Sequence, residues 1–135
     1  MRILIDSNIL ISAVYNPRGT PYRAFLKAVA YPNKGIICEQ NVKEIHRIFH
    51  RKFPDKLYLL ERFLLSALTV IELVDIPEKE IDDEQAVRDP ADRPILRAAV
   101  KAHADILLTG DKDFLEANIT NLKVMTASDF LNSSI

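Results

Sequence analysis

The sequence predicts an α/β domain with a mostly parallel sheet. Short apolar runs, typical of buried strands, alternate with longer segments whose apolar residues recur every three to four positions, as in amphipathic helices. The strand-like runs are apolar on both faces, so each needs a layer of helices on either side. Together these observations favour a parallel sheet enclosed between helices.

The composition fits one globular domain over residues 1–135, with 48% hydrophobic and 27% charged residues. A single cysteine excludes an intrachain disulfide and suits a reducing compartment. No apolar run approaches the roughly 20 residues that span a bilayer, and Asp6 interrupts the N-terminal apolar stretch. We therefore expect a cytoplasmic protein that does not enter a membrane.

Five apolar runs predict the strands, and each ends at a polar or turn residue. The first stops abruptly at Asp6, and the fourth is closed by Gly110 and Asp111. The expected strands are Met1–Ile5, Ile36–Cys38, Thr69–Val74, Ile106–Thr109 and Lys123–Thr126.

Capping residues and prolines mark the expected helices. Asp6, Ser7 or Asn8 would cap the first helix, and Gln40 or Asn41 the third. The expected helices are residues 7–13, Thr20–Ala30, residues 41–52, a segment after Asp55 that reaches Leu68, residues 93–104 and 113–117, and a last turn capped by Ser128. Residues 75–92 hold eight acids against two bases and are expected to be largely a solvated loop.

Two helices have recognisable apolar stripes that should face the core. The stripe of the third helix is Val42, Ile45, Ile48, Phe49 and Phe53. The stripe of the fourth is Leu57, Leu60, Leu64, Leu65 and Leu68.

Four acids should meet at one edge of the sheet. Asp6 follows the first strand and Asp111 the fourth, while Glu44 lies in the helix after the second strand and Asp92 caps the helix after the third. Sites of open parallel α/β sheets form at the carboxyl ends of the strands. Each acid also has a structural reading: Asp6 and Asp92 as helix caps, Glu44 as a first-turn acid and Asp111 as a turn residue.

Clustered carboxylates remain ionised only when cations neutralise them. A set of oxygen ligands without cysteine or an obligatory histidine favours Mg²⁺ or Mn²⁺. Such ions activate water and stabilise the leaving oxygen in phosphodiester hydrolysis. The pattern therefore indicates a metal-dependent enzyme that hydrolyses phosphodiesters.

The residues that carry this pattern resemble those of PIN-domain proteins. The opening ILIDSNILISA resembles the start of the family, and DPADRPILRAAVKAHADILLTGDKDFL resembles its second half. Glu44, followed by Ile45 and Ile48, is similar to the family's helix-borne glutamate. The resemblance covers essentially the whole chain, and the toxins of prokaryotic type II toxin–antitoxin systems are the subgroup it is most similar to.

The resemblance implies a three-layer α/β/α sandwich around a five-stranded parallel sheet of order 3-2-1-4-5. It implies a nuclease that uses Mg²⁺ or Mn²⁺ to cleave RNA, a homodimer and an antitoxin partner. The acidic site that it implies consists of Asp6, Glu44, Asp92 and Asp111. The supporting positions that it implies are Asn8, Thr109, Asp113 and Asp89. Asp89 competes with Asp92 for one role, and Asp92 is preferred because it stands three residues before Ile95.

Basic residues offer a second signal. Residues 1–70 carry a net charge of +6 and residues 71–135 a net charge of −7. Lys43, Arg47 and Arg51 recur every four residues on the helix of Glu44, where they would bind RNA phosphates or form a solvated face. Two alternatives to a ribonuclease stay open: a PIN-like module that binds RNA or protein without turnover, and a phosphohydrolase acting on DNA or a small phosphate ester.

Overall fold

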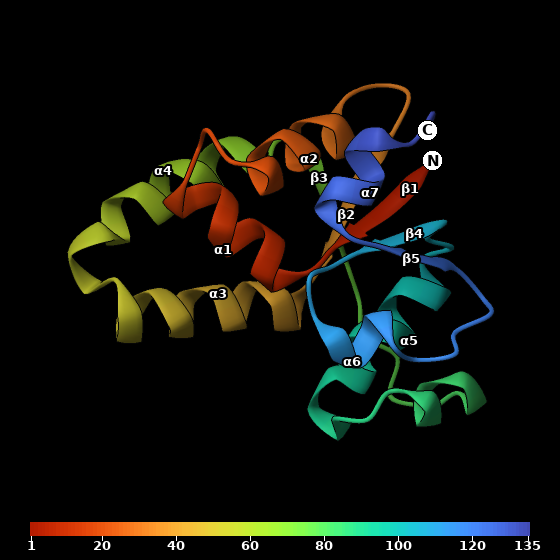
Figure 1. The fold of residues 1–135 in the computed structure, drawn as a ribbon. Coiled ribbons are helices and arrows are strands. Elements are labelled where there is room, and N and C mark those ends of the chain that lie inside the picture. The colour runs from red at the N-terminus through yellow and green to blue at the C-terminus, as the bar shows by residue number, and fades with distance from the viewer.

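The computed structural model describes residues 1–135 and is built on one five-stranded sheet in which all paired strands are parallel (Figure 1). The order is β3-β2-β1-β4-β5, as expected. The strands are β1 (Arg2–Ile5), β2 (Lys34–Cys38), β3 (Ile71–Val74), β4 (Ile106–Leu108) and β5 (Lys123–Met125). β1 lies at the centre, where Ile3 pairs with Gly35 on one side and Ile106 on the other.

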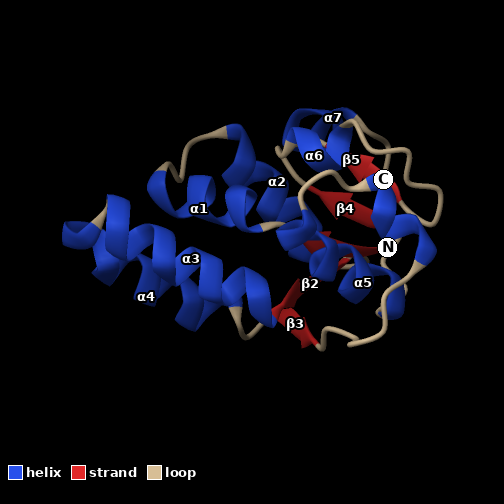
Figure 2. Ribbon diagram, turned by 90° about the horizontal axis from the view of Figure 1, so that it is seen from below, coloured by secondary structure: helices blue, strands red, loops and turns tan.

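Helices cover both faces of the sheet, which confirms the three-layer sandwich (Figures 1 and 2). On one face lie α1 (Ser7–Tyr15), α2 (Thr20–Val29), α3 (Glu39–Lys52), α4 (Leu57–Ala67) and α7 (Ala127–Asn132). On the other lie α5 (Arg93–Lys101) and α6 (Lys112–Leu115). None of these helices is long and apolar enough to cross a membrane.

Alternation along β1 divides the core in two. Ile3 and Ile5 are fully buried under the larger helix layer, whereas Leu4 is fully buried under α5 and α6. Successive side chains of a strand point to opposite faces, so one apolar run supplies both cores. Gly35 lies where α2 comes close to β2, because a Cβ at this residue would stand 2.9 Å from Val29 Cγ1.

α3 and α4 form an arm that extends beyond the sheet (Figure 2). A 3₁₀ turn, Pro54–Lys56, joins them. The tilted ring of Phe53 packs against Phe49 at 5.3 Å and against Tyr15 of α1 at 4.8 Å between ring centroids, and these contacts tie the base of the turn to α1.

The expected stripe of α4 is correct only in part. Leu60 and Leu64 are buried, but Leu65 is 76% and Leu68 49% exposed, so their predicted inward orientation is wrong. The outer surface of a projecting arm meets no second layer, and helical spacing alone does not reveal this. In α3 the stripe is confirmed at Ile45 and Phe49, which are buried.

The caps differ from expectation at two helices. α3 begins at Glu39, earlier than predicted, because the Asn41 side chain reaches back to accept a hydrogen bond from the Cys38 N–H at 3.1 Å. α7 is capped by Thr126, which accepts from the Asp129 N–H at 3.1 Å, and not by Ser128. The cap of α1 is Asp6, one of the three residues expected.

Residues 75–92 are mostly exposed, as expected, but they are not all loop. They contain two 3₁₀ turns, Asp82–Ala86 and Pro90–Asp92. Glu84 is fully buried, and its Oε1 lies 3.0 Å from Nε of Arg97 on α5. Arg97 also donates to the carbonyl of Pro77 at 3.0 Å. This buried ion pair fastens the acidic segment to α5, and a count of charges cannot distinguish such a pair from solvated acids.

Candidate active site

Two neighbouring strands deliver the first acids. Asp6 comes directly after β1, and Asp111 follows β4 after Thr109 and Gly110. Because β1 and β4 pair in parallel, both acids lie at the carboxyl edge of the sheet. The backbone N–H of Asp6 donates to the Leu108 carbonyl at 2.9 Å, so the pairing continues up to the site itself.

Asp6 lies at the bottom of the site and is only 3% exposed. One carboxylate oxygen accepts from the Ser7 N–H at 2.8 Å and from Asn41 Nδ2 at 3.2 Å. The other accepts from the Thr109 hydroxyl at 2.8 Å and from Asn8 Nδ2 at 3.0 Å. Four donors thus hold the carboxylate in one orientation.

Burial raises the pKa of Asp6 from 3.8 to about 6, in spite of the hydrogen bonds from Thr109 and Ser7, which act to lower it. The negative charges of Glu44 and Asp111 raise it further. Glu44 and Asp111 therefore lie close enough to Asp6 for their charges to act on it. Ionisation of Asp6 in the fold therefore costs more free energy than ionisation of a free aspartate.

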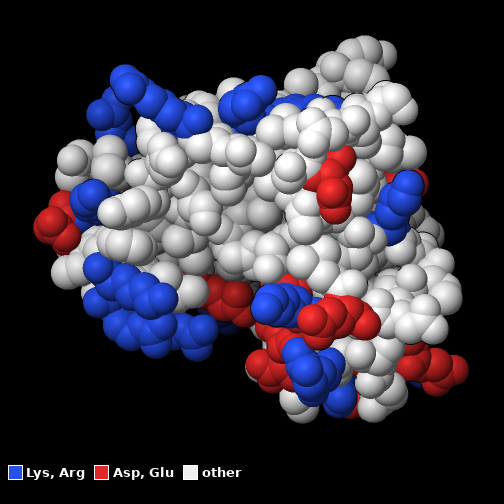
Figure 3. Space-filling model, in the orientation of Figure 1, with Lys and Arg blue, Asp and Glu red and all other residues white.

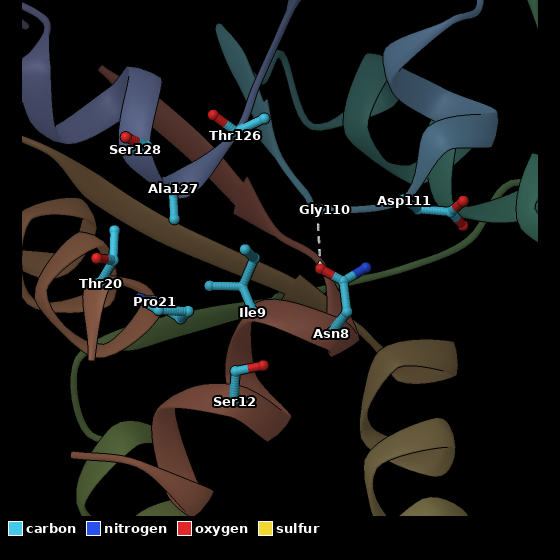
Figure 4. Close-up of a pocket in the computed structure, with 10 residues that line it drawn as sticks. All are labelled: Asn8, Ile9, Ser12, Thr20, Pro21, Gly110, Asp111, Thr126, Ala127 and Ser128. Atoms are coloured by element: carbon cyan, nitrogen blue, oxygen red, sulfur yellow. Dashed lines mark hydrogen bonds between the residues drawn. The ribbon is translucent and has the colours of Figure 1, made fainter. Parts of the chain in front are cut away.

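Asn8 and Thr109, which the sequence offered as supporting positions, hydrogen-bond to Asp6 and to each other. Asn8 Nδ2 contacts Thr109 Oγ1 at 3.3 Å as well as Asp6, and Asn8 Oδ1 accepts from the Gly110 N–H at 2.8 Å (Figure 4). Thr109 Oγ1 in turn accepts from the Asp111 N–H at 3.0 Å. One short network joins the start of α1 to the turn that carries Asp111.

Asn41 is a member of this network that our sequence reasoning did not assign to the site. It is fully buried, and its Nδ2 donates to Asp6 and, at 3.0 Å, to Ser7 Oγ. A signal was present, since Asn41 stands four residues before Ile45 and eight before Phe49, both on the buried side of α3. A polar residue in line with an apolar stripe needs buried partners.

Asp92 completes the group at the start of α5. Burial raises its pKa from 3.8 to about 7, and the neighbouring charges of Asp111, Asp89 and Asp6 act in the same direction. A side-chain hydrogen bond between Asp92 and Asp111 also raises the pKa of Asp92, because it favours the protonated form. Glu44 joins from α3, where Gln40 Nε2 donates to its Oε1 at 3.2 Å and to the Ala91 carbonyl at 2.7 Å.

Asp89 and Asp113 lie beside Asp92, and one carboxylate oxygen of each of the three falls within 4.8 Å of the others. Asp113 is engaged by Arg88, whose Nε and Nη2 donate to one oxygen at 2.8 and 2.6 Å. Asp89 accepts from the Ala91 N–H at 3.0 Å. These two acids thus line the outer side of the cluster, where Arg88 partly neutralises it.

The donor set suits a hard divalent cation. The residues that converge offer carboxylate oxygens, and the nearby thiol of Cys38 is buried with a pKa raised to about 11 by that burial. A protonated thiol is not a ligand for a metal. Asp92, Asp111 and Glu44 keep oxygens that accept no hydrogen bond from the protein, and these are the atoms open to an ion.

The basic residues of α3 flank the acids. Lys43, Arg47 and Arg51 are all exposed, and Lys43 forms a surface ion pair with Glu39 at 3.3 Å. In Figure 3 a blue patch covers α3, and acidic atoms lie in the hollow between this patch and the lobe of α5 and α6. A polyanion placed over α3 would reach the acids.

This sheet order, with carboxylates gathered at its carboxyl edge, defines a class of α/β proteins that carry an acidic site at the strand ends. The chain belongs to the PIN domain family, whose profile matches residues 2–113. An uncharacterised protein of Methanocaldococcus jannaschii is 26% identical over 97% of this chain and 90% of its own length.

Two solved structures are similar in fold. One is VapBC2 from Rickettsia felis bound to a DNA fragment from its promoter, with a TM-score of 0.69, 19% identity and coverage of 93% of this chain and 98% of that one. The other is VapC20 of Mycobacterium tuberculosis, described as a sarcin–ricin loop cleaving toxin, with a TM-score of 0.62, 16% identity and coverage of 89% and 98%. The fold of this chain is thus that of VapC toxins.

Proposed function

We propose that this protein is a metal-dependent endoribonuclease that hydrolyses RNA phosphodiester bonds, with residues 1–135 acting as one nuclease domain. The observation that carries the proposal is the meeting of Asp6, Glu44, Asp92 and Asp111 at the carboxyl edge of the sheet, where the pKa values of Asp6 and Asp92 are raised. Membership of the PIN domain family supports the reaction class.

Asp92, Asp111 and Glu44 would hold Mg²⁺ or Mn²⁺, with the charge of Asp6 beneath them. When bound, such an ion supplies positive charge that polarises the phosphodiester and favours attack by water. Asp6 would contribute its negative charge to the site, while its two oxygens stay oriented by their four donors.

The remaining residues position and bind. Thr109 and Asn41 keep the Asp6 carboxylate in place, so that the charge of the site does not shift when substrate arrives. Lys43, Arg47 and Arg51 would contact RNA phosphates on the α3 side, without reading the base sequence. Asp89 and Asp113 would act as outer acids.

The likeness to VapBC2 and VapC20 supports a further assignment as the toxin of a toxin–antitoxin pair in the cytoplasm. We propose that an antitoxin protein restrains the enzyme and that the chain forms a homodimer. Apolar side chains exposed on the larger helix layer, such as Leu26 and Tyr58, are available for such contacts.

The test is cleavage of a mixed single-stranded RNA by protein free of contaminating ribonuclease, with Mg²⁺, Mn²⁺ or EDTA. We expect cutting that EDTA abolishes and that Asp6→Asn and Asp92→Asn lack. Asp55→Asn, which removes an exposed acid near the tip of the arm, serves as the matched control and should cut normally.

Cleavage by Asp6→Asn at the wild-type rate would overturn the assignment. Metal binding without turnover would favour a binding module, and cleavage of DNA or of a small phosphate ester but not RNA would favour another phosphohydrolase.

A further inference from the structure

A pocket of ≈ 690 Å³ opens directly beside the acidic site (Figure 4). It lies between the N-terminal halves of α1 and α2, the turn after β4 and the start of α7. The residues that line it are Asn8, Ile9, Ser12, Thr20, Pro21, Gly110, Asp111, Thr126, Ala127 and Ser128. Asn8, Gly110 and Asp111 belong both to the pocket and to the network around Asp6.

The chemistry of the lining is neutral and rich in hydroxyl groups. Ser12, Thr20 and Ser128 are exposed to the pocket, and their hydroxyls make no hydrogen bond within the protein. Half-buried Pro21 provides apolar surface, whereas Ile9 also lines the pocket but is only 4% exposed. No lysine or arginine lines the pocket. Such a surface suits an uncharged, flat, hydrogen-bonding group.

The only charged lining residue is Asp111, and its carboxylate points away from the pocket in Figure 4. In the same view α3, drawn in gold, lies beyond Asn8 on the other side of the site. The basic residues Lys43 and Arg47 belong to that helix. The exposed basic residues of α3 therefore do not belong to this pocket.

We propose that this pocket binds the base and ribose of one nucleotide next to the scissile phosphodiester. The inference rests on the proposed ribonuclease activity and adds a base-binding subsite to it, because an unpaired base beside the cut can turn into a pocket. The hydroxyl groups of Ser12, Thr20 and Ser128 donate and accept hydrogen bonds at the edge of the base, and Pro21 lies against its face. The pocket thereby gives the enzyme a base preference that the phosphate contacts on α3 cannot supply.

The first test needs neither metal nor catalysis. ¹⁵N-labelled protein in EDTA is titrated with each of the four ribonucleoside 5′-monophosphates, and amide chemical shifts are followed. We expect shifts centred on Ser12, Thr20 and Ser128, larger for one base than for the others, and lost in Ser12→Phe, whose ring fills the pocket. Absence of shifts at these amides up to about 10 mM nucleotide, or equal shifts in Ser12→Phe, would overturn the proposal.

The second test uses cleavage of a randomised single-stranded RNA with Mn²⁺, followed by sequencing of the new ends. We expect a base preference at one nucleotide beside the cut that falls about fivefold in Ser12→Phe and in Ser128→Phe, as expected when one or two hydrogen bonds are lost. Ser66→Phe, at an exposed helical serine on α4, is the matched control and should keep the preference.

The two tests separate this inference from the proposed function. An unchanged base profile in both filled variants, with cleavage intact, overturns the pocket assignment and leaves the ribonuclease in place. Nucleotide shifts that Ser12→Phe abolishes, in a wild-type protein that cuts no RNA, support the pocket and count against the ribonuclease.

Discussion

The buried charge of Asp6 should make the metal-free protein less stable as pH rises. Burial raises the pKa of this carboxyl from 3.8 to about 6. The folded state then binds a proton at Asp6 more tightly than the unfolded state does. The contribution of Asp6 to the free energy of unfolding is therefore fully present below pH 4 and is lost as pH rises through about 6. At about 1.4 kcal/mol per pKa unit, the full cost of ionised Asp6 is about 3 kcal/mol.

Asp6→Asn isolates this contribution. The amide carries no charge, but its NH₂ faces donors that the carboxylate accepted, which costs about 1–3 kcal/mol at every pH. Because this cost is the same at every pH, it does not alter how the free energy of unfolding changes with pH. Relative to Asp6→Asn, the wild-type protein should lose about 1.4 kcal/mol of unfolding free energy between pH 5 and pH 8, the remainder having been lost below pH 5.

Urea denaturation in EDTA, followed by circular dichroism because the chain has no tryptophan, measures this difference. Asp55→Asn is the control and should follow the wild-type curve. Addition of Mn²⁺ at a hundred times its dissociation constant should stabilise the wild-type protein by about 2.7 kcal/mol and the variant far less. Parallel pH curves for wild type and Asp6→Asn, with equal stabilisation by Mn²⁺, would refute the reasoning.

Three further predictions concern the ion pair, the basic face of α3 and the end of α5. Arg97→Met should destabilise the fold by about 3–5 kcal/mol, since it leaves the buried charge of Glu84 without its cationic partner, and the double variant with Glu84→Gln should recover part of this in urea denaturation. Lys43→Glu with Arg47→Glu should weaken RNA binding for all sequences and lower the salt slope by about 2 in filter-binding titrations; unchanged binding would assign these residues to a solvated face. His103→Gly should stabilise the protein by up to about 1 kcal/mol, because His103 has a φ of 57° after the end of α5; a lower melting temperature would contradict this.

The fold was predictable because its signals are local and repeated. β1, β2 and β4 are short runs without a polar residue facing either core, and such runs specify strands buried on both faces. Leu65 and Leu68 were misjudged because their environment depends on how far the arm projects from the sheet, and this is a tertiary property. The boundary of α3 was misplaced because it depends on one side chain, Asn41, bonding to the backbone of Cys38.

The acids of the candidate site were predictable from where the strands end, but their partners were not. Asp6 and Asp111 follow paired strands, so the topology alone brings them to one edge. Asn41 and the Glu84–Arg97 pair depend on contacts between residues far apart in sequence, and each residue alone is compatible with a cap or a solvated surface. The hydroxyl-rich pocket is likewise assembled from four separate segments, none of which has a pattern of its own.

The capping role of the acids does not explain their charge. Asp6 caps α1, and Asp111 caps α6 by accepting from the Asp113 N–H at 2.9 Å. A cap requires only an acceptor, and serine or asparagine provides one without a charge. Asp6, however, is 3% exposed and lies beside other carboxylates, and four donors do not prevent its pKa from rising to about 6. A neutral cap would avoid this destabilisation, so the carboxylates at this edge need a further reason, which the proposed divalent cation would supply by making their charge favourable.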